Sequence, residues 1–67
     1  MEEKIIKLLR ERPGLRKRMV ASHLRVPVKD VISLMYQMCY EGKLRYEVYK
    51  DIPNMEYYEK YYVVEGK

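Results

Sequence analysis

The spacing of the apolar residues changes at Gly42, and this change constrains the fold more than any other feature of the sequence. Before Gly42, apolar side chains recur at steps of three and four residues, the period of a helix buried on one face. After it, Leu44, Tyr46 and Val48 alternate with other side chains, which is the period of a strand. The chain is therefore expected to be α+β, with helices first and a hairpin last.

Three helices are expected before Gly42, and turn residues separate them. They span residues 2–12, 16–24 and 28–41. Pro13-Gly14 ends the first helix, because the residue before a proline avoids the α region and glycine reverses the chain cheaply. Pro27 suits the first turn of the third helix, and Gly42 suits its end. The expected apolar stripes are Ile5, Leu8 and Leu9; Met19, Val20 and Leu24; and Val31, Leu34, Met35 and Met38.

The segment after Gly42 is expected to form a two-stranded hairpin. Asp51-Ile52-Pro53-Asn54 has turn chemistry, and residues 57–64 are rich in Tyr and Val, which favour strands. The favoured register sets Leu44 opposite Val63, Tyr46 opposite Tyr61 and Glu47 opposite Lys60. Cross-strand aromatic and opposite-charge pairs stabilise such a register, each by about 0.2–1 kcal/mol.

Length and composition limit the classes of protein that remain. A chain of 67 residues is expected to be a single domain, residues 1–67. One Cys and one His cannot form an intrachain disulfide or a structural zinc site, so no metal is expected. No catalytic set and no phosphate-binding glycine loop is visible, so neither an enzyme nor a cofactor or small-molecule ligand is expected. The N-terminus has no signal pattern and no stretch could span a membrane, which favours an intracellular, cytoplasmic protein.

Positive charge is concentrated in the first half of the chain. Residues 1–29 carry nine Lys or Arg and three Glu, whereas residues 30–67 carry five Lys or Arg and seven Asp or Glu. The densest stretch, residues 10–18, holds five cations and one anion. A basic patch of this kind favours a polyanionic partner, although it can also be a solvated charged face.

The order of elements and several local motifs resemble the winged helix-turn-helix family over nearly the whole chain. The matching positions are Val20-Ala21, Leu24-Arg25-Val26-Pro27, Val31, Met35, Met38, Gly42 and Leu44. They follow the family pattern of a small residue in the second helix, a Leu before the tight turn, and a Leu-x-x-Leu-x-x-x-Gly-x-Leu run into the first wing strand. The resemblance implies three helices followed by a two-stranded β-hairpin wing, and double-stranded DNA as the partner.

Two positions depart from the family pattern. Arg25 stands where members usually have Gly with positive φ, so either the turn is altered or Arg25 tolerates a conformation that costs about 1 kcal/mol. Arg16-Lys17-Arg18 stands where members have a Ser or Thr cap, and cations at a helix N-terminus are unfavourable. A phosphate at that helix end would reverse the sign of the penalty.

The resemblance implies a DNA-binding role for two groups of residues. The third helix would lie in the major groove and present Lys29, Ser33, Tyr36 and Gln37. The expected phosphate ligands are Arg16, Lys17, Arg18, Arg25 and, at the wing tip, Lys50. Such a protein would be a transcription regulator with sequence-specific or semi-specific binding, and with modest specificity because its recognition helix has no Arg.

Two alternatives remain beside this hypothesis. The uncharged recognition helix and the acidic second half also suit a winged helix that binds protein as a subunit of a larger complex. Lys29 and Tyr36 match the branch that binds Z-form nucleic acid, but Ile32 and Ser33 stand where that branch has Asn and Arg. That departure argues against Z-form binding.

A homodimer is a further expectation. Regulators that read palindromic operators are commonly two-fold dimers. The chain has eight Tyr, more than a domain of this size can bury, and Tyr is enriched in interfaces. Tyr46, Tyr57, Tyr61 and Tyr62 are expected to pack or pair in the hairpin. The Tyr-rich wing and the first helix are the two candidate dimer interfaces.

Overall fold

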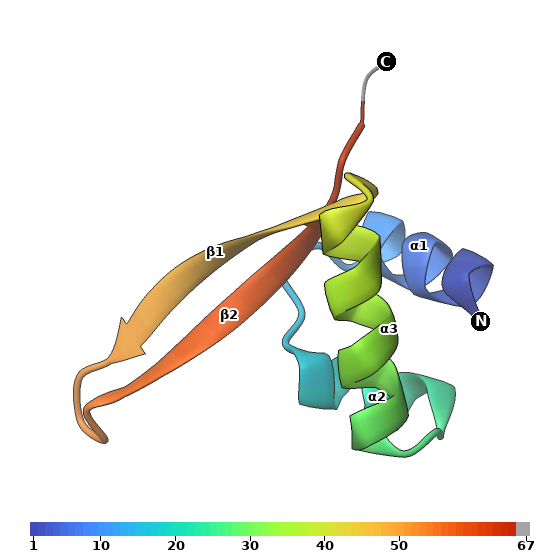
Figure 1. Ribbon diagram of the computed structural model, residues 1–67. Helices are drawn as coiled ribbons and strands as arrows, with labels where there is room; N and C mark the ends of the chain where they lie inside the picture. The colour runs from blue at the N-terminus through green and yellow to red at the C-terminus, as the bar shows by residue number, and fades with distance from the viewer. Residues whose placement is uncertain (66–67) are drawn as a thin grey trace.

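A computed structural model of the chain describes residues 1–65, so the last two residues of the expected domain lie outside the described part. Three helices are followed by a two-stranded antiparallel hairpin, as expected. The elements are α1 (Glu2–Glu11), α2 (Lys17–Leu24), α3 (Val28–Tyr40), β1 (Leu44–Asp51) and β2 (Glu56–Val63). The helices lie together and the hairpin extends away from them (Figure 1). This α+β arrangement is consistent with a winged helix.

One hydrophobic core joins the helices to the base of the hairpin. Its fully or nearly fully buried members are Ile5, Leu9, Val20, Ala21, Val31, Met35, Met38, Leu44 and Tyr61. The helical members recur at steps of three and four residues, which confirms the expected periodicity. Met19 is an exception, because it is 48% exposed and Ala21 takes the core position instead. Ala21 and Leu24 lie three residues apart on the inward face of α2, and Met19 lies outside that stripe.

The hairpin has the expected register. Leu44 lies opposite Val63, Tyr46 opposite Tyr61 and Glu47 opposite Lys60. The rings of Tyr46 and Tyr61 are 5.7 Å apart between centroids, a distance typical of a favourable aromatic pair. The predicted register is therefore confirmed.

A short extended segment before α2 pairs with β2, which the sequence did not indicate. The Tyr61 N–H donates to the Leu15 carbonyl at 3.0 Å, and the Gly14 N–H donates to the Tyr61 carbonyl at 2.9 Å. Gly14 has a φ of +88°, which glycine adopts at no steric cost. These bonds hold the base of the hairpin against the segment that leads into α2.

The turn between α2 and α3 contains a non-glycine residue with a positive φ. Arg25 lies in the left-handed region, with φ 59° and ψ 46°. The Arg25 N–H donates to the Ser22 carbonyl and the Val26 N–H to the Ala21 carbonyl, which closes the end of α2. Of the two expectations for this turn, the structure therefore has the one in which Arg25 tolerates the strain.

Candidate nucleic-acid interface

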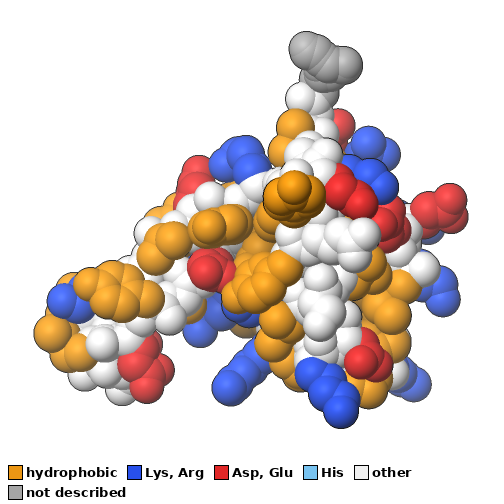
Figure 2. Space-filling model, viewed as in Figure 1, with side chains coloured by type: hydrophobic (Ala, Val, Ile, Leu, Met, Phe, Trp, Pro, Cys, Tyr) orange, Lys and Arg blue, Asp and Glu red, His pale blue; other side chains and the backbone are white. Residues whose placement is uncertain are grey.

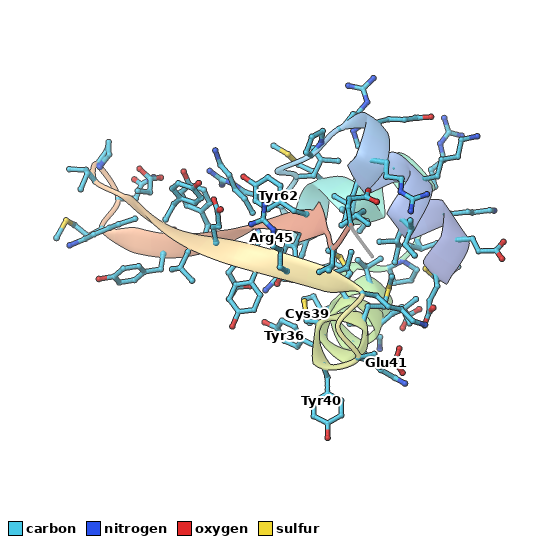
Figure 3. All side chains as sticks on the ribbon, turned by 90° about the horizontal axis from the view of Figure 1, so that it is seen from above. Tyr36, Cys39, Tyr40, Glu41, Arg45 and Tyr62 are labelled. Atoms are coloured by element: carbon cyan, nitrogen blue, oxygen red, sulfur yellow. The ribbon has the colours of Figure 1, made fainter. Side chains whose placement is uncertain are left out.

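The outward face of α3 presents the four side chains expected of it. Lys29, Ser33, Tyr36 and Gln37 are all exposed, and we call these four residues the α3 face. The Gln37 amide donates to Glu41 Oε2 at 3.1 Å, an exposed contact that water or a base edge can replace. One turn beyond Tyr36, the Tyr40 side chain is 93% exposed and projects away from the rest of the molecule (Figure 3). The α3 face is polar, and Tyr40 protrudes beside it.

Lys17 is held between three elements and does not point freely into solvent. Its Nζ lies 2.9 Å from the Tyr36 hydroxyl and 3.1 Å from Glu59 Oε1, and its side chain is only 23% exposed. Partial burial alone would lower the pKa of Lys17, but the bonds to Tyr36 and Glu59 outweigh it and raise the pKa. Lys17 therefore stays charged and joins α2 to both α3 and β2.

Glu59 is the centre of the same cluster. The Tyr61 hydroxyl donates to Glu59 Oε1 at 2.5 Å, and this bond, together with Lys17, lowers the pKa of Glu59 despite its partial burial. Burial and the bond to Glu59 raise the pKa of the Tyr61 phenol well above its ordinary value. We call Lys17, Tyr36, Glu59 and Tyr61 the Lys17 cluster. The positive charge of Lys17 and the negative charge of Glu59 balance. The cluster therefore positions the elements around it and gives no net attraction for phosphate.

The two arginines beside Lys17 remain exposed. The Arg16 guanidinium lies 3.7 Å from the centroid of the Tyr58 ring, a cation–π contact that orients it. Arg18 is exposed and makes no ion pair within residues 1–65. Both line an open groove of about 340 Å³ between α2 and the hairpin, here called the α2–hairpin groove. The groove is lined by Arg16, Lys17, Arg18, Val48, Glu56, Tyr57, Tyr58 and Glu59.

The remaining two predicted phosphate ligands lie apart from this pair. Arg25 is exposed at the opposite end of α2, about 12 Å from its start by the rise of an eight-residue helix. Lys50 is exposed near the hairpin turn, with its Nζ 5.8 Å from the centroid of the Tyr57 ring. Arg16 and Arg18 thus line one groove, and Arg25 and Lys50 lie outside it.

Hydrophobic side chains also reach the surface next to the α3 face. Figure 2 shows them spreading from α3 onto the hairpin, with Lys and Arg side chains along the lower edge of the helical part. The exposed ones on these elements include Tyr36, Tyr40, Tyr46, Val48 and Tyr57. Tyr57, expected to pack or pair in the hairpin, pairs with Lys50 across the strands, and its side chain is 70% exposed near the tip.

The sequence interpretation missed Glu59 as a partner of Lys17. The two residues are 42 positions apart, so no local pattern connects them. One signal was present: Glu59 shares a face of β2 with Tyr57 and Tyr61, and a carboxylate next to a core residue on a strand is expected to have a partner.

The described residues give no indication of a metal site or a membrane span. Within residues 1–65, no group of three or more His, Cys, Asp or Glu could hold a metal ion. No helix in that range is long and apolar enough to cross a bilayer. Comparison with known proteins returned no matching family model and no matching curated protein.

Proposed function

We propose that the chain is a winged-helix protein that binds double-stranded DNA and regulates transcription inside the cell. The α3 face lies in the major groove, and the arginines at the start of α2 contact the phosphates beside that groove. Ser33 and Gln37 read base edges, Gln37 after releasing Glu41, and Lys29 supplies a cation at the N-terminal end of the helix.

The observation that carries the proposal is the 2.9 Å contact between Lys17 Nζ and the Tyr36 hydroxyl. It brings the start of α2 against the middle of the α3 face. Arg16 and Arg18 flank Lys17 in the sequence and are exposed, so they lie where the phosphates bordering an occupied groove would pass. A cap-less helix start that carries three cations is unfavourable on its own, and phosphate neutralises that penalty.

The structure changes the list of proposed phosphate ligands. Lys17 is paired with Glu59 and is proposed to position Tyr36 and the start of α2. Arg16, Arg18, Arg25 and Lys50 remain as ligands. Four phosphate contacts predict a slope of log affinity against log salt near −3.6, from about 0.9 per contact on duplex DNA.

The test is the salt dependence of binding to a mixed-sequence duplex, followed by fluorescence anisotropy. Arg16→Ala/Arg18→Ala removes two contacts, and the slope is expected to fall to about −1.8. The matched control is Lys4→Ala/Lys7→Ala, which removes the same charge from exposed positions on α1. Equal slopes for the two double variants, or no binding at low salt, would contradict the proposal.

A second candidate is a winged helix that binds a protein instead of DNA. The specific observation in its favour is the exposed aromatic and aliphatic surface of α3 and β1, above all Tyr40, Tyr46 and Val48. Exposed apolar groups of this size are typical of protein interfaces. Absence of duplex binding at low salt, in a chain that stays folded, would favour this candidate.

A further inference from the structure

One edge of the hairpin is covered and the other is open. The Leu15 segment covers part of the β2 edge through its two bonds with Tyr61. Figure 1 shows β2 between β1 and that segment, so β1 is the outer strand. Within residues 1–65, no other strand pairs with the outer edge of β1.

The alternation of hydrogen bonds between β1 and β2 shows which backbone groups of β1 are unpaired on its outer edge. In an antiparallel pair, every second residue directs its N–H and C=O groups to the partner strand and the others direct them away. The Val64 N–H donates to the Lys43 carbonyl at 2.9 Å, so residue 43 and every second residue after it face β2. The residues whose backbone groups point outward are Leu44, Tyr46, Val48 and Lys50. Tyr61, opposite Tyr46, likewise directs its groups away from β1 and toward Leu15, which agrees with this phase.

We propose that the open edge of β1 is the interface of a homodimer, in which the β1 strands of two copies pair antiparallel about Val48. The two hairpins then form one continuous four-stranded sheet. This proposal does not depend on DNA binding. It concerns a different edge of the molecule from the α3 face, and its tests contain no DNA.

Charge complementarity selects a second copy as the occupant. Pairing about Val48 places Arg45 of one copy opposite Asp51 of the other, twice by symmetry. It also places Tyr46 opposite Lys50, Glu47 opposite Tyr49, and the Val48 residues opposite each other. Opposite-charge and apolar cross-strand pairs are stabilising, so the Arg45–Asp51 and Val48–Val48 pairs favour this register, and no pair in it sets like charges opposite each other.

The neighbouring registers are less favourable. The backbone groups of β1 that point outward belong to every second residue. A shifted register is therefore allowed only if outward-pointing residues of the two copies still lie opposite each other. One such shift sets Glu47 opposite Glu47, and the shift in the other direction sets Glu47 opposite Asp51. Like charges directly opposite each other are destabilising. Pairing about Tyr46 joins only five residues of each strand, from Leu44 to Val48.

Exposed side chains on β1 supply the apolar part of the interface. Val48 is 57% exposed and Tyr46 is 48% exposed in the single chain. The charged partners can also be reached: Arg45 is exposed, with a bond to Glu47 and a cation–π contact with Tyr62, and Asp51 is partly exposed and accepts a bond from Asn54 in the turn. Charges along an edge strand hinder pairing with an arbitrary strand. In β1, by contrast, Arg45 of one copy and Asp51 of a second copy would lie opposite each other.

The first test is disulfide cross-linking of single-cysteine variants in a Cys39→Ala background. At the two-fold axis, the Cα atoms of the two Val48 residues would be about 5.5 Å apart, within reach of a disulfide. The two Tyr46 residues would be about 14 Å apart, four residues along the strand. Val48→Cys is therefore expected to cross-link under mild oxidation at micromolar concentration, and Tyr46→Cys is not. Preferential cross-linking of Tyr46→Cys, or no difference from the same reaction in urea, would overturn the proposal.

The second test reverses the charge pair and measures the dimer by sedimentation equilibrium. Arg45→Asp and Asp51→Arg each place like charges opposite each other, and each is expected to raise the dimer dissociation constant about tenfold. The double variant restores opposite charges and is expected to recover most of the loss. A wild-type chain that stays monomeric, or a double variant with the summed loss of the two single variants, would contradict the proposal. Circular dichroism of each variant checks that the helices are retained.

Discussion

At the scale of single residues, the Lys17 cluster decides how the candidate interface is built. Lys17 donates to Tyr36 on α3 and to Glu59 on β2, and Glu59 also accepts from Tyr61. Both members of the ion pair are about three-quarters buried, where charge-assisted hydrogen bonds are stronger than on an open surface. The most basic stretch of the sequence therefore contributes one structural lysine and two arginines that are available to a ligand.

The pH dependence of stability tests this cluster through Glu59→Gln. The folded-state pKa of Glu59 lies below its ordinary value of 4.5, so its contribution is complete above pH 4.5 and is lost as the pH falls through the lowered pKa. Glu59→Gln is expected to cost about 1 kcal/mol at neutral pH. Its difference from wild type should narrow as the pH falls below 4.5 and through the lowered pKa of Glu59. Urea denaturation across this range measures the difference.

The control for this experiment is Glu56→Gln, an exposed residue on the same strand. It makes no side-chain hydrogen bond among residues 1–65, and it is expected to keep the wild-type profile. A constant difference between wild type and Glu59→Gln over the acid range would show that the carboxylate does not stabilise the fold through its charge.

At the scale of elements, the helices and the hairpin register could be predicted, and the contacts between elements could not. The stripe of Val31, Met35 and Met38 follows from helical spacing alone, and the register follows from which pairs of side chains favour each other. The Leu15–Tyr61 pairing uses only backbone groups, so no side-chain pattern indicated it. The Lys17–Glu59 pair depends on how β2 packs against α2, which the sequence of neither element specifies.

Substitutions of Arg25, in the turn between α2 and α3, test whether its left-handed backbone is strained. Arg25→Gly relieves the left-handed strain at φ 59° and is expected to stabilise the fold by about 0.5–1 kcal/mol. Arg25→Ala keeps the strain and is expected to leave stability nearly unchanged. Both variants lose the guanidinium, so both should weaken duplex binding equally. Equal unfolding midpoints for the two variants in urea would contradict the strain argument.

At the scale of the whole molecule, the fold separates two surfaces. The α3 face and the arginines at the start of α2 lie on the helical part, and the open edge of β1 lies on the hairpin that extends from it (Figure 1). In the view from above, Arg45 and Tyr62 lie on the side of the hairpin away from Tyr36 and Tyr40 (Figure 3). The asymmetric charge of the sequence thus corresponds to a basic helical part and a hairpin of mixed charge. A dimer through β1 would leave both α3 faces exposed.

In the proposed function, duplex DNA binds the α3 face and the start of α2. The most direct measurement is a two-dimensional NMR titration of the isotope-labelled chain with a short mixed-sequence duplex at low salt. If duplex DNA binds there, the backbone amides of residues 16–18, 25 and 29–37 are expected to shift, with little change in α1. Shifts confined to the hairpin and Tyr40, or none at all in a folded chain, would contradict the proposed function.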